Sequence, residues 1–148
     1  MQNRFETFTV LINRISRNIR KIKNQEMAEY KLRSTHISCL YYLFTHRGAT
    51  ATELCEYCEE DKATISRALE YLESNGFIGC ETKNGKRYKS PLYLTEKGHE
   101  VGRKISGKID AVLDAVSVSL SEVERLAFYR SLSIISESLD AVSKSYEK

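Results

Sequence analysis

The sequence contains few of the residues that interrupt helices. Among its 148 residues there are seven glycines and a single proline, Pro91. No apolar run approaches the roughly 20 residues that a membrane-spanning helix needs. The N-terminal residues also lack the continuous apolar segment and the small-residue cleavage site of a signal peptide. We therefore expect a mostly helical protein that lies in the cytoplasm and has no membrane partner.

The short motifs that mark common active sites are absent as well. The sequence has no glycine-rich phosphate loop, no GxSxG or HExxH motif and no clustered pair of carboxylates. We therefore expect neither an enzymatic activity nor a cofactor.

The cysteines and histidines do not form a recognisable metal site. Cys55 and Cys58 are spaced as CxxC, but the sequence has no second CxxC or HxxxH that would complete a zinc site. Together with Ala51 and Leu54 they follow an i, i+3, i+4, i+7 spacing, which predicts that both cysteines are small apolar residues on the core face of a helix. We expect no bound metal and, for a cytosolic protein, no structural disulfide.

Basic residues are unevenly distributed along the chain. The formal net charge is only +3, which by itself does not argue for a nucleic-acid partner. A predicted hairpin, however, carries four basic side chains within seven residues and no acid between them: Lys83, Lys86, Arg87 and Lys89. This cluster is informative because its position in the fold gives the charge a target.

Both ends of the chain carry apolar residues at helical spacing. Steps of three and four residues alternate in the N-terminal stripe and in the stripe of the last helix, so that each is heptad-like. An amphipathic helix of this kind cannot bury its stripe alone and needs a partner helix. We therefore predict dimerisation contacts by the following residues: Phe5, Phe8, Ile12, Ile15 and Ile19, and Phe128, Leu132, Ile135, Leu139 and Val142.

Turn and capping signals divide the middle of the chain into short helices. A helix is predicted from about Thr35 to Thr45, with Gly48 as its stop signal. Thr50 and Glu53 form a capping box that starts the next helix. Similar signals predict three further helix starts and one helix end: Asp61, Thr95 and Ser121 with Glu124 as starts, and Asn75–Gly76 as an end.

Two β-strands are predicted between these helices, over residues 77–82 and 90–94. Asn84–Gly85 between them is a strong hairpin-turn signal. Pro91 falls inside the second run and must therefore lie at a sheet edge or at the start of a strand. The order of elements over residues 50–98 is helix, turn, helix, strand, charged loop, strand, which is that of a winged helix-turn-helix.

The helix that follows Asp61 has the two faces that a DNA-reading helix needs. One side is apolar and faces its own domain: Ile65, Ala68, Leu69 and Leu72. The other side and the first turn carry residues that suit the major groove: Lys62, Ala63, Thr64, Ser66 and Arg67. We predict that Arg67 contacts a guanine edge, while the hairpin cluster contacts the phosphate backbone.

In this order and spacing the motifs closely resemble the MarR family of bacterial transcriptional regulators. The resemblance rests on Asp61–Arg67, Gly76–Ile78 and Leu94–Gly98, and the flanking helices extend it over essentially the whole chain. It implies a mostly α-helical winged helix-turn-helix with a small β-hairpin wing, assembled as a homodimer whose N- and C-terminal helices interlock. The implied organisation is one domain over 1–148, with dimerisation helices over 1–30 and 99–148 and a DNA-binding lobe over 31–98.

The sequence departs from the family pattern at the wing. The family usually carries an acidic residue two positions before the wing arginine, whereas Asn84-Gly85-Lys86-Arg87 contains no acid. The resemblance assigns the role of that arginine to Arg87. It does not supply the oxidant-sensing cysteine that some members carry in the first helix, because no cysteine precedes Cys39.

The resemblance also implies a class of effector. Aromatic anions are typical effectors of the family and bind between the winged lobe and the dimer helices. Tyr30, Tyr41, Tyr42 and Phe44 are candidates to line such a cleft, although aromatic residues at helical spacing more often belong to the core.

The leading functional hypothesis is a sequence-specific regulator of transcription, a repressor rather than an activator. It would bind a pseudo-palindromic site in double-stranded DNA as a homodimer and be released by a small-molecule effector of unknown identity. Such an effector has to prefer one spacing of the two reading helices over another. The alternative hypothesis is a winged-helix module that binds other proteins and no DNA.

Overall fold

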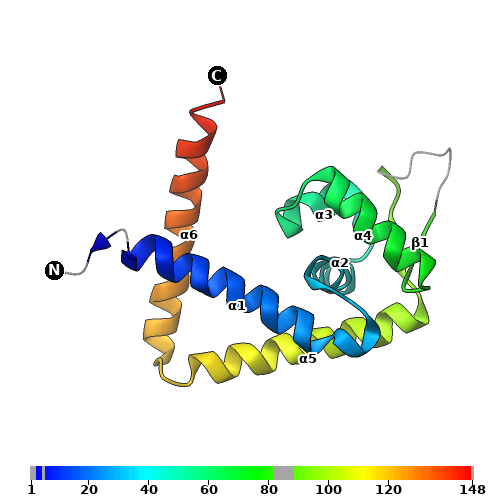
Figure 1. Cartoon of the computed structure of the whole chain (residues 1–148), viewed down its shortest axis with the longest axis horizontal. Helices are drawn as coiled ribbons and strands as arrows, with labels where there is room; N and C mark the ends of the chain where they lie inside the picture. The colour runs from blue at the N-terminus through cyan, green and yellow to red at the C-terminus, as the bar shows by residue number, and fades with distance from the viewer. Residues whose placement is uncertain (1–2, 5, 82–88, 148) are drawn as a thin grey trace. The chain divides into compact units, whose positions relative to one another are not determined.

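The computed structural model of the protein describes residues 3–4, 6–81 and 89–147, and it divides into two compact units, Met1–Lys108 and Ile109–Lys148. The elements in chain order are η1 (Glu6–Val10), α1 (Leu11–Glu26), η2 (Ala28–Tyr30), α2 (Ser34–Thr45), α3 (Ala51–Cys58), α4 (Lys62–Ser74), β1 (Ile78–Cys80), β2 (Leu92–Leu94), α5 (Glu96–Ser117) and α6 (Glu122–Lys144) (Figure 1). The predicted fold class, mostly α with a small hairpin wing, is confirmed. Within the described ranges, no helix combines the length and the apolarity needed to cross a bilayer.

Side-chain caps start the helices where the sequence predicts them. Thr50 Oγ1 accepts a hydrogen bond from the Glu53 N–H at 3.2 Å, and the Glu53 carboxylate accepts one from the Thr50 N–H at 3.3 Å. Ser121 and Glu124 repeat this capping box at the start of α6, with distances of 3.2 and 2.8 Å. After α4, Gly76 adopts a φ of +78°, in the left-handed region that glycine occupies without strain.

Helix α2 forms the centre of the first unit. It packs against α1, α3, α4 and β2, and Figure 1 shows it between α1 and α4. Its Cys39 and Leu40 side chains are completely buried. Helix α4 contributes the predicted apolar face, and all four of its members are buried: Ile65, Ala68, Leu69 and Leu72. Because burial of one large aliphatic side chain stabilises by ~1.5–3 kcal/mol, this face fixes the rotation of α4 about its axis.

The strands of the wing are shorter than predicted. Each has three residues, whereas runs over 77–82 and 90–94 were expected. They pair antiparallel, with Gly79 opposite Tyr93. Pro91 lies directly before β2, which is consistent with its lack of a ladder N–H. The predicted turn at Asn84–Gly85 lies outside the described residues.

The residues after β2 join the wing to α5 through several close contacts. The Thr95 hydroxyl donates a hydrogen bond to the Gly76 carbonyl at 2.6 Å and accepts one from the Gly98 N–H at 3.1 Å, so that it caps α5 as predicted. A Cβ at Gly98 would overlap the backbone carbonyl of Phe77. The Lys97 ammonium lies 4.3 Å from the centre of the Phe77 ring. Thr95, Lys97 and Gly98, which carry part of the family resemblance, are thus the residues that fasten α5 to the end of α4.

The apolar stripe of the first helix is largely exposed in the single chain. Residues 6–10 form a π-helical turn, so the regular helix begins at Leu11 and later than the stripe suggested. Four predicted dimerisation residues on this segment are between 39% and 52% exposed: Phe8, Ile12, Ile15 and Ile19. Phe5 lies outside the described residues.

The C-terminal end of α1 is tied to the first part of α5. Lys108 Nζ lies 3.2 Å from a carboxylate oxygen of Glu26 and donates a hydrogen bond to the Glu26 backbone carbonyl at 2.8 Å. Lys104 Nζ donates to the Tyr30 hydroxyl at 2.7 Å. Exposed ion pairs of this kind contribute only ~0–1 kcal/mol each, so they orient α1 more than they stabilise the unit.

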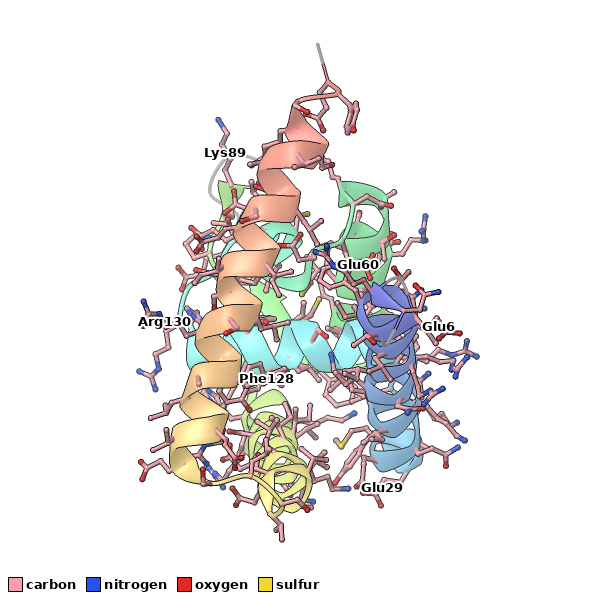
Figure 2. The ribbon with its side chains drawn as sticks, turned by 90° about the vertical axis from the view of Figure 1, so that its left-hand side faces the viewer. Glu6, Glu29, Glu60, Lys89, Phe128 and Arg130 are labelled. Carbon is pink, nitrogen blue, oxygen red and sulfur yellow. The ribbon has the colours of Figure 1, made fainter. Side chains whose placement is uncertain are left out.

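The second unit contains the end of α5 and all of α6. None of the described residues of α6 is fully buried. Phe128 and Arg130 leave different sides of the helix (Figure 2). Four of the predicted dimerisation residues on α6 are 39–53% exposed: Phe128, Leu132, Leu139 and Val142. The fifth, Ile135, is partly exposed.

Candidate nucleic-acid interface

Helices α3 and α4 are joined by a tight turn at residues 59–61. Glu59 ends α3 in the left-handed conformation, with a φ of 53°. The Asp61 carboxylate accepts a hydrogen bond from the Thr64 N–H at 2.7 Å and caps α4 as predicted. This hydrogen bond holds the pKa of the Asp61 carboxyl below its usual value. The charged carboxylate also interacts favourably with the positive N-terminal end of the helix.

The outward face of α4 carries the residues predicted to read bases. Lys62, Ala63, Ser66 and Arg67 are exposed, and Thr64 is partly exposed. Arg67 Nη2 donates to the Thr64 hydroxyl at 3.4 Å, a long hydrogen bond that is readily exchanged for another acceptor. We refer to α4 as the reading helix, after the role that the sequence predicts for it. The exposed guanidinium of Arg67 has the planar pair of donors that fits the O6 and N7 atoms of guanine.

The wing, defined here as β1, β2 and the residues between them, lies next in the chain. The Tyr93 ring covers Gly79 on the facing strand, and a Cβ at position 79 would overlap that ring. Lys89, the last member of the basic cluster, is exposed shortly before β2. Lys83, Lys86 and Arg87 lie outside the described residues, so their contacts remain a prediction.

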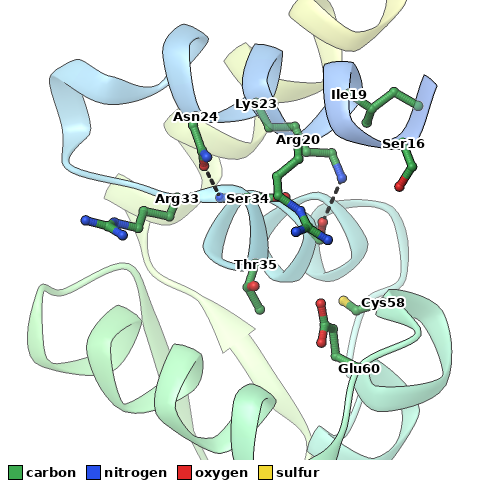
Figure 3. Close-up of a pocket in the computed structure, with 11 residues that line it drawn as sticks. Ser16, Ile19, Arg20, Lys23, Asn24, Arg33, Ser34, Thr35, Cys58 and Glu60 are labelled. Carbon is green, nitrogen blue, oxygen red and sulfur yellow. Dashed lines mark hydrogen bonds between the residues drawn. The ribbon is translucent and has the colours of Figure 1, made fainter. Parts of the chain in front are cut away.

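A pocket of about 580 Å³ lies between α1, α2 and the end of α3. Its polar lining includes Arg20 and Lys23 from α1, Arg33 before α2, and Glu60 from the turn before the reading helix (Figure 3). Lys23 Nζ donates a hydrogen bond to the hydroxyl of Ser38 at 3.0 Å. Burial is the main cause that lowers the pKa of Lys23. Three basic side chains and one carboxylate thus line the same pocket.

The residues that line this pocket do not include the four aromatic candidates, Tyr30, Tyr41, Tyr42 and Phe44. That those four residues line an effector cleft stays a prediction. Phe44 packs instead against α5, where its ring lies edge-on to His99 with centroids 6.4 Å apart. Tyr42 stacks on Tyr57 of α3, with centroids 5.3 Å apart. The only sequence signal for the pocket was the basic composition of the first helix, which is equally typical of a solvated surface.

The prediction for the cysteines is correct only in part. Leu54 is buried, but Cys55 and Cys58 are partly exposed rather than on the core face of α3. The reason is that α3 has only eight residues, and its last residue, Cys58, already borders the pocket. In the parts of the chain that the structure describes, no three His, Cys, Asp or Glu side chains are placed to hold a metal ion.

Comparisons with known proteins agree with this fold. No family model matches the chain. The uncharacterised HTH-type transcriptional regulator YwoH of Bacillus subtilis is 26% identical over 117 residues, which cover 79% of this chain and 85% of that protein. A crystal structure of MarR superposes with a TM-score of 0.76 at 26% identity and covers 100% of this chain and 99% of its own. The complex of Staphylococcus aureus MepR with DNA gives a TM-score of 0.81 at 20% identity, and the match covers 93% of this chain and 99% of the MepR chain.

These similarities confirm the resemblance to the MarR family that the sequence predicts. They indicate an HTH-type transcriptional regulator, and the relatives are described as regulators rather than enzymes.

Proposed function

We infer that this chain, a winged helix-turn-helix protein of the MarR family, binds a pseudo-palindromic DNA operator as a homodimer and represses transcription. The observation that carries the proposal is the outward face of the reading helix, where Arg67, Ser66 and Lys62 are exposed while the opposite face is buried. Because its operator would lie on the bacterial chromosome, the protein would act in the cytoplasm.

The reading helix is suited to the major groove of DNA. The groove is about 12 Å wide and admits one α-helix, provided that the outward side chains are short or able to donate hydrogen bonds. In this proposal Arg67 contacts a guanine, Thr64 and Ser66 contact bases or phosphates, and Ala63 contacts a thymine methyl group. MepR, which shares the fold, has been crystallised in complex with DNA, and this supports DNA as the partner.

The wing supplies affinity in the same proposal. Lys83, Lys86, Arg87 and Lys89 contact phosphates, and each neutralised phosphate releases a condensed counterion. Such contacts set the register of the protein on the duplex but carry no sequence information. The basic wing therefore strengthens binding to every duplex, while the reading helix selects among them.

The exposed apolar stripes support a homodimer. Ile15 is 52% exposed on α1, and Leu139 is 50% exposed on α6. Clustered exposure of this kind marks an interaction surface. We propose that residues 1–30 and 99–148 form the dimer interface and that residues 31–98 form the DNA-binding lobe. Two lobes related by a two-fold axis would read half-sites about 34–36 Å apart.

The pocket between α1 and α2 is the proposed effector site. It is formed by the first helix and by the lobe, and Glu60 belongs to the turn that leads into the reading helix. An anionic molecule held by Arg20, Lys23 and Arg33 would stabilise the conformation of these elements in which the pocket is open. It releases the repressor only if that arrangement differs from the DNA-bound one.

The proposal is tested by fluorescence anisotropy with a duplex from upstream of the protein's own gene and a random duplex, over a series of salt concentrations. Tight, strongly salt-dependent binding of the upstream duplex alone is expected. Equal and weak binding of both duplexes would contradict recognition of that duplex, and no binding of either would favour the protein-interaction alternative.

A further inference from the structure

The pocket between α1, α2 and the end of α3 has an almost entirely polar lining. Among the described residues that form it, only Ile19 and Cys58 are apolar. The others are the three basic side chains, the Glu60 carboxylate, the Asn24 amide and four hydroxyl groups, those of Ser16, Ser34, Thr35 and Ser38. Pockets that bind aromatic ligands are usually lined by apolar and aromatic side chains. This lining therefore favours a ligand that is itself polar over most of its surface.

The basic side chains of the pocket have no carboxylate partner within the described part of the chain. Ion pairs there are made by lysines of α5 and α6, and Arg20, Lys23 and Arg33 take part in none of them. Lys23 Nζ donates instead to the neutral hydroxyl of Ser38, at 3.0 Å. Burial lowers the pKa of Lys23, and the positive charge of Arg20 adds to this effect. An anion bound between Arg20 and Lys23 would offset both the burial and the repulsion.

Glu60 distinguishes this pocket from a simple anion site. Figure 3 shows Arg20 and Lys23 reaching from α1 toward α2, with Glu60 on the side of the pocket away from α1. A carboxylate repels a second anion, but it accepts hydrogen bonds from hydroxyl groups. The pocket thus offers positive charge on one side and a hydrogen-bond acceptor on the other, with hydroxyl groups that can both donate and accept among them.

From this arrangement we propose that the pocket binds a sugar phosphate, that is, a phosphate monoester that also carries several hydroxyl groups. The inference rests on the proposed function, because it names the chemical class of the effector of that same pocket. Arg20 and Lys23 hold the phosphate, and Glu60 accepts a hydrogen bond from a hydroxyl group of the ligand. This class differs from the aromatic anions that the family resemblance implies.

A phosphate suits the basic side better than a carboxylate does. It carries close to two negative charges at neutral pH and has three strong acceptor oxygens. It can therefore accept hydrogen bonds from a guanidinium, an ammonium and a hydroxyl group at the same time. The volume of about 580 Å³ lies within the range of ~300–1,000 Å³ that is typical of small-molecule sites, so a sugar has room beside the phosphate.

Such a ligand would join the first helix to the turn that precedes the reading helix. Arg20 and Lys23 belong to α1, whereas Glu60 directly precedes Asp61, the residue that caps α4. One molecule bound at both ends fixes the distance between these two segments. It changes the affinity for DNA if that distance differs in the DNA-bound protein.

Isothermal titration calorimetry of the full-length protein, in a buffer without phosphate and at low salt, tests the ligand class directly. The probes are glucose 6-phosphate, fructose 6-phosphate and ribose 5-phosphate, and the comparison ligands are inorganic phosphate, glucose and salicylate. At least one sugar phosphate should bind about tenfold or more tightly than each comparison ligand, because only it uses both sides of the pocket.

Two substitutions on the basic side form a matched pair. Arg20→Gln removes a charged donor and should weaken binding of the sugar phosphate by about tenfold or more. Lys21→Gln removes the same charge from the adjacent position of α1, where the side chain is exposed and does not line the pocket. It should bind like the wild type. Equal losses in the two variants would reduce the effect to general electrostatic attraction and would overturn the site.

Glu60→Gln tests the other side of the pocket. Binding of the sugar phosphate should weaken, because a charged acceptor for its hydroxyl group is lost. Binding of inorganic phosphate should not weaken, because a repulsive charge is removed. Tighter binding of both ligands by Glu60→Gln would show that Glu60 only repels the anion, and this would overturn the role of the sugar.

The wild-type titrations decide the proposal independently of the variants. Failure of all three sugar phosphates to bind, binding no tighter than that of inorganic phosphate, or tighter binding of salicylate would each overturn it. Binding of the upstream duplex is measured separately, with and without the sugar phosphate. A protein that binds a sugar phosphate but ignores DNA would contradict the proposed function and not the ligand class. A protein that binds the duplex but none of the three probes would contradict the ligand class alone.

Discussion

The Tyr71 hydroxyl on the reading helix donates a hydrogen bond to the backbone carbonyl of Lys31 at 2.7 Å. Lys31 adopts the left-handed conformation, with a φ of 57°, in the segment between α1 and α2. The Tyr71 ring also stacks on His36, with centroids 4.3 Å apart. The Nδ1 atom of His36 in turn accepts a hydrogen bond from the Arg33 N–H at 3.1 Å. The reading helix is therefore fastened to the segment that follows the first helix.

Tyr71→Phe should lower the free energy of unfolding by ~0.5–1.5 kcal/mol, because the hydrogen bond is lost while the stacked ring remains. Urea unfolding followed by circular dichroism measures the change. Tyr146→Phe is the matched control, since Tyr146 is 82% exposed near the C-terminus. If both variants unfold like the wild type, the Tyr71–Lys31 hydrogen bond contributes nothing to stability.

Arg67→Ala should weaken binding of the operator by ~1–3 kcal/mol and relax the choice of base at one position. The expected cause is the loss of two parallel donors to a guanine. Anisotropy titrations with the operator, with single-base variants of it and with a random duplex measure the effect.

Arg67→Lys is the matched control because it keeps the charge but loses the planar pair of donors. It should bind the operator nearly as weakly as Arg67→Ala while retaining most of the affinity for random DNA. Equal losses on both kinds of duplex in Arg67→Ala, restored by lysine, would instead identify Arg67 as a phosphate contact.

Lys89→Ala and Arg87→Ala should each weaken binding of all duplexes and reduce the salt dependence of affinity by about one unit of slope, as expected when one phosphate contact is lost. The slope is obtained from titrations at several salt concentrations. Lys144→Ala serves as the control, since this lysine on α6 has a side chain that is 68% exposed and pairs with Asp140. An unchanged slope would remove the substituted wing residue from the interface.

The features that the sequence predicted well are those encoded within a few residues. The caps at Thr50 and Ser121 depend on a partner three positions away, so their spacing is visible in the sequence. The pocket was not predictable in this way, because Arg20, Arg33 and Glu60 meet only after three separate segments have packed.

The requirement for glycine at one position also depends on a contact that the sequence does not reveal. The need for glycine at position 98 comes from the Phe77 carbonyl, which belongs to a different element. The sequence pattern contained this glycine as part of the family resemblance but gave no physical reason for it. The structure supplies the reason: a Cβ at position 98 would meet backbone, whereas a Cβ at Gly107 of the same helix would meet nothing within 4 Å.

Gly98→Ala should destabilise the protein strongly, by ~3 kcal/mol or more, because the new methyl group would overlap backbone rather than a flexible side chain. Gly107→Ala on the same helix has open space around its Cβ and should stabilise by ~0.5–1 kcal/mol. Thermal unfolding of the two variants compares them directly. Opposite signs are expected, and a shared sign would show that helix propensity, not the contact with Phe77, decides the outcome at position 98.

Ile15→Glu should convert the proposed dimer to monomers at concentrations where the wild type is dimeric. Ile15 lies in the middle of the α1 stripe and is 52% exposed in the single chain. A carboxylate buried in an interface without a partner costs ~3 kcal/mol or more, which corresponds to a roughly 100-fold weaker dimer. Sedimentation velocity over a range of protein concentrations measures the dissociation constant.

Asn13→Glu is the matched control for this substitution. It introduces the same charge into the same helix. Position 13 is two residues before Ile15, so its side chain points to nearly the opposite side of α1. The control should remain a dimer and keep its affinity for the operator, whereas Ile15→Glu should lose the affinity that comes from binding two half-sites at once. A wild type that sediments as a monomer, or an Ile15→Glu variant that stays dimeric, would show that the α1 stripe has another partner.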